Sequence, residues 1–276
     1  MEAKESGKSR KWYYTLARVI LFYICSIAVL IFTSIFTKFT SIFTKNVSAK
    51  IADQLSILCA TILTFILVLI FTHWEKLKLK DVGIIPGRKS TMRFFTGFSA
   101  GLLMAVIQAL IVLGFGHFQL KLVPKITIAE IFLPLLLYLF VACREELVFR
   151  SYSLRSLGYS LTPIIALIII TVIFILEHVV SGMTWKMAML GSGAGGILFG
   201  LAALKTKGIA LPVGLHSAWN FGQWSLGFKN KPGIWEAIID KGYETKVENI
   251  GLTAFLFVMA LAIAGVFIFY KKEKLL

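Results

Sequence analysis

The stretch that decides the fold class is Ile131-Phe132-Leu133-Pro134-Leu135-Leu136-Leu137-Tyr138-Leu139-Phe140-Val141-Ala142-Cys143-Arg144-Glu145-Glu146-Leu147-Val148-Phe149-Arg150. No residue before Cys143 in this stretch is charged, which predicts a helix that enters a membrane. Two carboxylates and two guanidiniums then follow, at a depth where ionisable groups are costly and usually functional. We therefore expect a membrane protein whose functional site contains Glu145, Glu146 and Arg150.

The composition of the whole chain supports this interpretation. Hydrophobic residues make up 58% of the 276 residues and charged residues only 16%, which is typical of integral membrane proteins. Helix-length apolar runs recur, so spanning helices fit better than the short alternating strands of a β-barrel. The net charge of +15 has no soluble basic domain to carry it. We therefore relate it to membrane topology and anionic lipid headgroups rather than to nucleic acid.

The sequence predicts an all-α fold, a polytopic bundle of about eight transmembrane helices in a single integral membrane domain, residues 1–276. Residues 1–125 would hold three spans and a basic loop, and residues 250–276 the last span and a basic tail. The predicted spans are residues 12–35, 52–73, 94–116, 126–157, 161–180, 187–204, 208–224 and 250–270. An even number of spans puts both termini on one side, and most of the 29 Lys and Arg residues lie on that side. This bias predicts cytoplasmic termini.

Two further spans carry polar residues at helical spacing. Phe174 and His178 are four residues apart in the fifth span, and His216 and Asn220 are four apart in the seventh, so each pair shares a helix face. If the fourth and fifth helices are antiparallel, Glu145 and His178 differ in depth by only about 7 Å at ~1.5 Å per residue. We therefore expect an active site between helices 4, 5 and 7.

Each of these residues also has a structural interpretation. Glu146 and Arg150 could form an ion pair within their helix, His178 could be a hydrogen-bonded core histidine, and His216 with Asn220 could join helices by polar contacts. Glu145 is different because Arg150 can neutralise only one carboxylate. A second carboxylate at low dielectric is suited to act as a general base or acid. The combination favours catalysis.

Three blocks together resemble the CPBP intramembrane proteases: Glu145-Glu146-x-x-x-Arg150, Phe174-x-x-x-His178 and His216-x-x-x-Asn220. This family, also called Abi, contains the type II CAAX prenyl endopeptidases and bacteriocin-processing and immunity proteins. Its catalytic core would cover about residues 130–224. Motifs of other intramembrane proteases, namely GxSG, GxGD and HExxH, do not occur in the sequence.

The resemblance implies specific roles for these residues in peptide hydrolysis. Glu145 with His178 would activate the attacking water, and His216 with Asn220 would stabilise the oxyanion. Glu146, Arg150 and Phe174 would support the site. No cofactor is expected, although the family is often labelled a metalloprotease. If a metal ion such as zinc is used, the resemblance gives Glu145, His178 and His216 as its ligands.

The same resemblance implies a membrane-anchored peptide or protein as substrate: a CAAX-type tail, a bacteriocin or a signalling-peptide precursor. The expected location is the lipid bilayer of the plasma membrane, with no nucleic-acid partner. Two other functions are weighed against hydrolysis. One is a non-catalytic immunity or binding protein on the same scaffold, and the other is a proton-coupled transporter. Transport predicts repeat symmetry and discontinuous helices, and we find no internal repeat.

Overall fold

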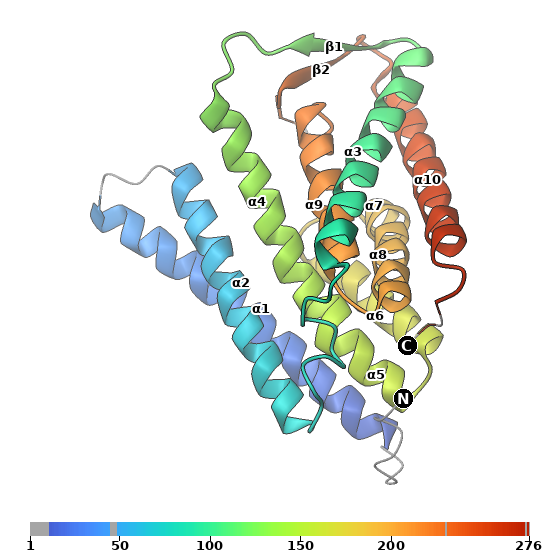
Figure 1. Ribbon diagram of the computed structural model, residues 1–276. Coiled ribbons are helices and arrows are strands. Elements are labelled where there is room, and N and C mark those ends of the chain that lie inside the picture. Colours follow the sequence, from blue (N-terminus) through green and yellow to red (C-terminus); the bar gives the residue numbers. More distant parts are fainter. Residues whose placement is uncertain (1–10, 45–48, 230, 274, 276) are drawn as a thin grey trace.

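The computed structural model describes residues 11–44, 49–229, 231–273 and 275, so the predicted N-terminal tail up to Arg10 lies outside the described residues, as do Lys45 in the loop after the first span and Lys274 in the C-terminal tail. Most of the described chain is helical (Figure 1). The helical elements are α1 (Trp12–Thr44), α2 (Ala49–Trp74), α3 (Ser90–Gly114), α4 (Ile128–Glu146), η2 (Leu147–Ser153), α5 (Leu154–Ser160), α6 (Pro163–Val180), α7 (Trp185–Met187), η3 (Ala188–Ser192), α8 (Gly193–Thr206), α9 (Ala210–Ser225) and α10 (Glu244–Phe269). The predicted all-α class is confirmed.

Six helices in the described part of the chain are long and apolar enough to cross a membrane. They cover Trp12–Phe39, Lys50–Trp74, Ser90–Gly114, Pro163–Val180, Trp185–Thr206 and Glu244–Phe269. The other two predicted spans correspond to α4 and α9. The helix α4 ends in Arg144, Glu145 and Glu146, and α9 has only 16 residues. Length and composition therefore support six of the eight predicted spans, and the remaining two are the helices that carry most of the polar site.

A two-stranded antiparallel ribbon closes one end of the bundle, which the sequence did not predict. Strand β1 (Phe118–Leu122) follows α3 and pairs with β2 (Trp235–Ile239), with Phe118 opposite Ile239. The start of α1 and the end of α10 lie at the opposite end of the bundle (Figure 1). The Phe118 ring stacks on Phe228 at a centroid distance of 5.4 Å, which ties the ribbon to the turn after α9.

The helix α4 starts at a sequence-encoded cap. The Thr127 side chain accepts a hydrogen bond from the Glu130 backbone N–H, and the Glu130 carboxylate accepts one from the Thr127 N–H. This reciprocal arrangement satisfies two of the backbone donors that a helix leaves unpaired at its start. From there the chain stays helical through η2 and α5, which agrees with the single predicted helix of residues 126–157.

The element η2 is a π-helical segment that begins directly after Glu146, and all of its residues are buried. Its wider turn is seen in the Ser153 hydroxyl, which donates to the Val148 carbonyl five residues earlier, at 2.7 Å. Isolated π turns occur often at functional sites because they change which side chains point inward. Nothing in the residue pattern predicted this register change.

The helices α4 and α9 lie at the centre of the bundle. The helix α4 contacts α2 on one side and α9 on the other, and α9 also contacts α3 and α8 (Figure 1). The contact between α3 and α9 is so close that backbone meets backbone. A Cβ atom on Gly214 would lie 2.1 Å from the Phe94 carbonyl oxygen, and one on Gly97 would lie 2.3 Å from the Leu211 oxygen. Glycine is therefore required at both positions.

We expect Gly214→Ala to destabilise the protein by about 1–3 kcal/mol, the usual cost of overpacking, because α9 must move away from α3. The matched control is Gly265→Ala on α10, where a Cβ would meet no atom within 4 Å. This control should keep the free energy of unfolding of wild type or raise it by up to about 1 kcal/mol, because alanine favours a helix more than glycine does. Thermal unfolding in detergent micelles measures both. Equal melting temperatures for the two variants would contradict the close contact.

Candidate active site

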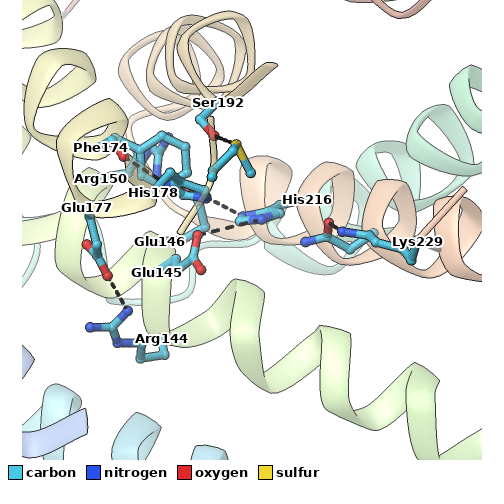
Figure 2. A network of polar contacts seen from close by, with 12 residues as sticks. Arg144, Glu145, Glu146, Arg150, Phe174, Glu177, His178, Ser192, His216 and Lys229 are labelled. Carbon is cyan, nitrogen blue, oxygen red and sulfur yellow. Dashed lines mark hydrogen bonds and ion pairs between the residues drawn. The ribbon is translucent and has the colours of Figure 1, made fainter. Parts of the chain in front are cut away.

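His216, in the first half of α9, lies between the two adjacent carboxylates at the end of α4 (Figure 2). Its Nδ1 is 2.9 Å from Glu146 Oε1, and its Nε2 is 3.8 Å from Glu145 Oε2. The imidazole is buried and stacks on the Phe199 ring of α8, with centroids 4.6 Å apart and planes 15° apart. The predicted meeting of Glu145 and His216 is present, whereas the contact between His216 and Glu146 was not foreseen.

Glu146 is fully buried and its charge is compensated inside the bundle. Its Oε1 is 3.5 Å from Arg150 Nη1, so the predicted pair is present. The Arg150 side chain is only 1% exposed. Because a buried ion pair needs such compensation on both sides, Glu146 fits the supporting role that the resemblance implies.

Three phenylalanine rings surround the Arg150 guanidinium. Its carbon lies 5.3 Å from the ring centroid of Phe149, 4.4 Å from that of Phe174 and 5.6 Å from that of Phe199. A guanidinium near aromatic faces gains cation–π attraction, which is larger when water is excluded. Only Phe174 of these rings was predicted to support the site. The rings and Glu146 together explain how a cation remains in an apolar bundle.

Glu145 differs from its neighbour in exposure and in partners. Its side chain is 16% exposed, and its Oε2 accepts no hydrogen bond from the described residues. Its principal electrostatic partners include His216 and His178. The side chain as a whole is partly exposed, and its buried Oε2 has no hydrogen-bond partner, so the carboxylate can accept a proton from a substrate or a water molecule.

His178 lies beside this cluster, near the end of α6 (Figure 2). Its Nδ1 is 2.9 Å from the backbone oxygen of Phe174, and the two rings meet edge to face at 4.4 Å. A carbonyl oxygen can only accept, so Nδ1 carries the proton and a neutral His178 offers its Nε2 as an acceptor. Phe174 therefore orients His178 and also contacts Arg150.

An ion pair joins α4 to α6. Its two members directly precede the predicted site residues Glu145 and His178. Arg144 Nη1 is 2.9 Å from Glu177 Oε1, and Arg144 Nη2 is 3.4 Å from the Ser26 hydroxyl of α1. The sequence prediction missed this contact. Opposite charges directly before Glu145 and His178 were the signal that could have revealed it. The pair fixes the spacing between the helices that carry these two residues.

We expect Glu177→Gln to destabilise the protein by about 3–5 kcal/mol, because Arg144 is only 4% exposed and would lose its counter-charge. The exposed Glu248→Gln on α10 is the control and should change stability little. Thermal unfolding in detergent compares the two variants. Restored stability in the double variant Arg144→Met/Glu177→Leu would support the ion-pair explanation. A Glu177→Gln variant as stable as the control would contradict it.

Asn220 lies one helical turn beyond His216 on α9, and its side chain contacts a residue that the sequence did not single out. The Nζ of Lys229 donates to Asn220 Oδ1 at 2.9 Å. The same Nζ lies 5.5 Å from the centroid of the Tyr138 ring on α4. Lys229 therefore bridges the two central helices at the side of the site that faces the ribbon.

The residues that the resemblance gave as metal ligands do not form a recognisable metal centre. Structural and catalytic zinc sites bring together at least three protein ligands. In the described ranges, no group of three or more His, Cys, Asp or Glu side chains is arranged to hold a metal ion. Glu145, His178 and His216 thus do not fit a zinc site in this arrangement, and we derive no step through a metal.

A cavity of about 480 Å³ lies between α2, the ribbon end of α4 and the segment after α9. Its lining combines apolar residues of the central helices with charged residues: Leu133, Pro134, Leu137, Trp224, Lys50, Lys125, Lys231, Asp53 and Glu130. Leu137 precedes Glu145 by two helical turns, about 12 Å at ~1.5 Å per residue. The cavity is therefore separate from the cluster around His216. Both lie along the contact between α4 and α9.

The helices and the site define an integral membrane protein with a buried carboxylate and histidine cluster between helices. Comparison with known families narrows this class. Residues 127–222 match the family model described as type II CAAX prenyl endopeptidase, Rce1-like. This match confirms, for this segment, the resemblance seen in the sequence. No curated protein and no solved structure matches the chain.

The matched segment runs from the cap of α4 almost to the end of α9. It contains every predicted site residue: Glu145, Glu146, Arg150, Phe174, His178, His216 and Asn220. The family is one of peptidases, so the match supports protease chemistry for this segment.

Proposed function

We propose that the protein is an intramembrane endopeptidase that hydrolyses a peptide bond in a membrane-associated protein or peptide. One observation carries this proposal: within the family-matched segment, Glu145 of α4 and His216 of α9 approach to 3.8 Å although they are far apart in sequence. Amide hydrolysis needs a base for water and donors for the developing oxyanion. The cluster offers both kinds of group on facing helices.

Glu145 is the proposed general base. Its Oε2, which accepts no hydrogen bond from the described residues and lies 3.8 Å from His216 Nε2, would take a proton from a water molecule while the water oxygen forms a bond to the scissile carbonyl carbon. His178, with Nε2 as acceptor, would orient the same water. As the tetrahedral intermediate collapses, the carbon–nitrogen bond breaks and Glu145 passes its proton to the leaving amine nitrogen.

His216 and Asn220 are the proposed oxyanion stabilisers. Glu146 accepts a hydrogen bond from His216 Nδ1, so a doubly protonated imidazole directs its Nε2–H toward the Glu145 side. In that state the charges of Glu145 and Glu146 are balanced by those of His216 and Arg150. A balanced cluster is the form in which charged groups are least costly inside a bundle. The amide of Asn220 would supply the second donor.

We propose that this mechanism uses no metal ion and that the substrate is anchored in the bilayer. A CAAX-type tail is the first substrate class to test because the family description names it. Bacteriocin or signalling-peptide precursors are the next.

The test is cleavage by purified full-length protein in detergent, with an internally quenched farnesylated CAAX peptide and a panel of internally quenched lipid-anchored peptides. Wild type, Glu145→Ala, His216→Ala and the control Glu248→Ala are compared with and without a chelator. We expect chelator-insensitive cleavage by wild type and control that both site variants lose. Equal cleavage by all four proteins, or none by wild type, would contradict the proposal and favour a binding or transport protein. Activity lost with chelator and restored by zinc would contradict the metal-free mechanism.

We also propose that both ends of the chain face the cytoplasm of a cell whose plasma membrane holds the protein. The start of α1 and the end of α10 lie at one end of the bundle (Figure 1), and the basic segment 76–89 joins α2 to α3. Excess Lys and Arg on one side favours the cytoplasm. Reporter fusions after Leu276 would test this, and a reporter that is active only outside the cytoplasm would contradict it.

A further inference from the structure

We infer that Lys229 is a positioning residue that fixes the side-chain amide of Asn220 so that the amide N–H donors face the reacting carbonyl. This inference rests on the proposed function. Lys229 lies beyond the residues matched by the family model, which end at 222. Among the predicted site residues, Asn220 is the one that accepts a hydrogen bond from Lys229.

The orientation of the amide follows from the chemistry of the contact. The oxygen and nitrogen of an asparagine side chain have similar shapes, so their positions are decided by the hydrogen-bond partner. A lysine ammonium has three donors and no acceptor. It can therefore face only Oδ1 of Asn220, which lies 2.9 Å from Nζ. The Nδ2 donors are consequently directed away from Lys229.

The backbone turns sharply after α9, so that the side chain of Lys229 lies beside the same helix. Gly227 has φ of +74° and ends α9, with its N–H donating to the Trp224 carbonyl and the next N–H donating to the Gln223 carbonyl. Glycine adopts this left-handed conformation without strain. A Cβ on Gly227 would lie 2.7 Å from the Ala237 nitrogen of β2, so the turn is also packed against the ribbon.

A neighbouring aromatic contact anchors the same turn. The ring of Phe228, directly before Lys229, stacks on Phe118 of β1 with an interplanar angle of 16°. The Lys229 ammonium then extends between Asn220 of α9 and the Tyr138 ring of α4. Lys229 is exposed, and its ammonium is positioned by the turn and by its contacts with Asn220 and the Tyr138 ring.

The contact between Lys229 and Asn220 is expected to affect the rate of catalysis. Without the cation, the Asn220 amide can rotate and present its oxygen to the oxyanion, which is repulsive. Because loss of one oxyanion donor lowers kcat by about 10²–10³-fold, partial misorientation should cost less. We expect Lys229→Met to lower kcat about 10-fold with little change in KM. Lys229→Arg keeps a donor and should restore most of the rate.

A double-mutant cycle separates positioning from general structural support. The probe is the quenched peptide that wild type cleaves fastest in the assay above, and the variants are Lys229→Met, Asn220→Ala and both together. Lys241→Met, an exposed lysine after β2, is the matched control. If Lys229 acts through Asn220, adding Lys229→Met to Asn220→Ala should have no further effect. Additive losses, or full kcat in Lys229→Met, would overturn the inference. Full activity in Asn220→Ala would instead contradict the oxyanion role in the proposed function.

A second measurement does not need a substrate. Amine acetylation of the full-length protein, followed by mass spectrometry, reports how freely the Lys229 ammonium reacts. Lys229 is exposed, so we expect its Asn220 contact to slow its acetylation in wild type and the reaction to be several-fold faster in Asn220→Leu, with Lys241 unchanged in both. Equal Lys229 rates in the two proteins would overturn the proposed contact.

Discussion

Glu145→Gln should lower kcat by about 10²–10⁴-fold while the melting temperature stays close to that of wild type. The amide has the shape of the carboxylate but cannot accept a proton from water. The structural cost is small because the Glu145 side chain is 16% exposed and one of its oxygens has no hydrogen-bond partner among the described residues. Peptide cleavage and thermal unfolding of the same preparation measure the two effects.

The matched control is the adjacent residue. Glu146→Gln leaves Arg150 without its counter-charge in a buried position and weakens the contact to His216. We therefore expect this variant to lose stability, unlike Glu145→Gln. A stable Glu146→Gln protein without activity, together with an active Glu145→Gln protein, would show that the roles of the two glutamates are reversed.

The second large effect concerns the folded state. Arg150→Met should destabilise the protein by about 3–5 kcal/mol, because Glu146 is 0% exposed and would lose its guanidinium counter-charge, keeping only the contact to His216. The substitution also removes the cation from the three phenylalanine rings that surround it. A loss of this size is a large part of the stability of a typical domain. Thermal unfolding and expression yield in membranes would report it.

A compensating variant tests the cause. In Arg150→Met/Glu146→Gln the buried carboxylate is neutral, so much of the lost stability should return. The rest measures the cation–π contacts and the hydrogen bond to His216. If the double variant is no more stable than Arg150→Met, then charge compensation is not the function of Arg150, and the packing of its side chain must explain the loss.

The sequence allowed the bundle and much of the site to be predicted, for physical reasons that apply to membrane helices. Apolar runs of helix length located α1, α2, α3, α6, α8 and α10 to within a few residues, apart from the end of α1 and the starts of α8 and α10. A carboxylate in such an environment must find a partner, so the pair of Glu146 with Arg150 followed from their spacing. Antiparallel packing and helix rise predicted similar depths for Glu145 and His178, and the position of His216 in its span predicted that it would join Glu145, as it does.

Other features depend on tertiary contacts that spacing does not determine. The ribbon pairs segments on either side of eight helical elements, and Phe118 and Phe228 become neighbours only after folding. The π turn at η2 decides that Arg150 faces Phe174 and Phe199, and no propensity predicts it. Lys229 looks like an ordinary loop residue until the Gly227 turn directs it to Asn220.

The most direct test of the central claim, that Glu145 activates water for attack on a peptide bond, is a single turnover in H₂¹⁸O. Protein in excess cleaves the quenched peptide once, and mass spectrometry then locates the label. We predict one ¹⁸O in the new carboxyl terminus of the product and none in the protein segment that contains Glu145. Label in Glu145 would show a covalent acyl intermediate on that residue, and an unlabelled or uncleaved peptide would contradict hydrolysis by activated water.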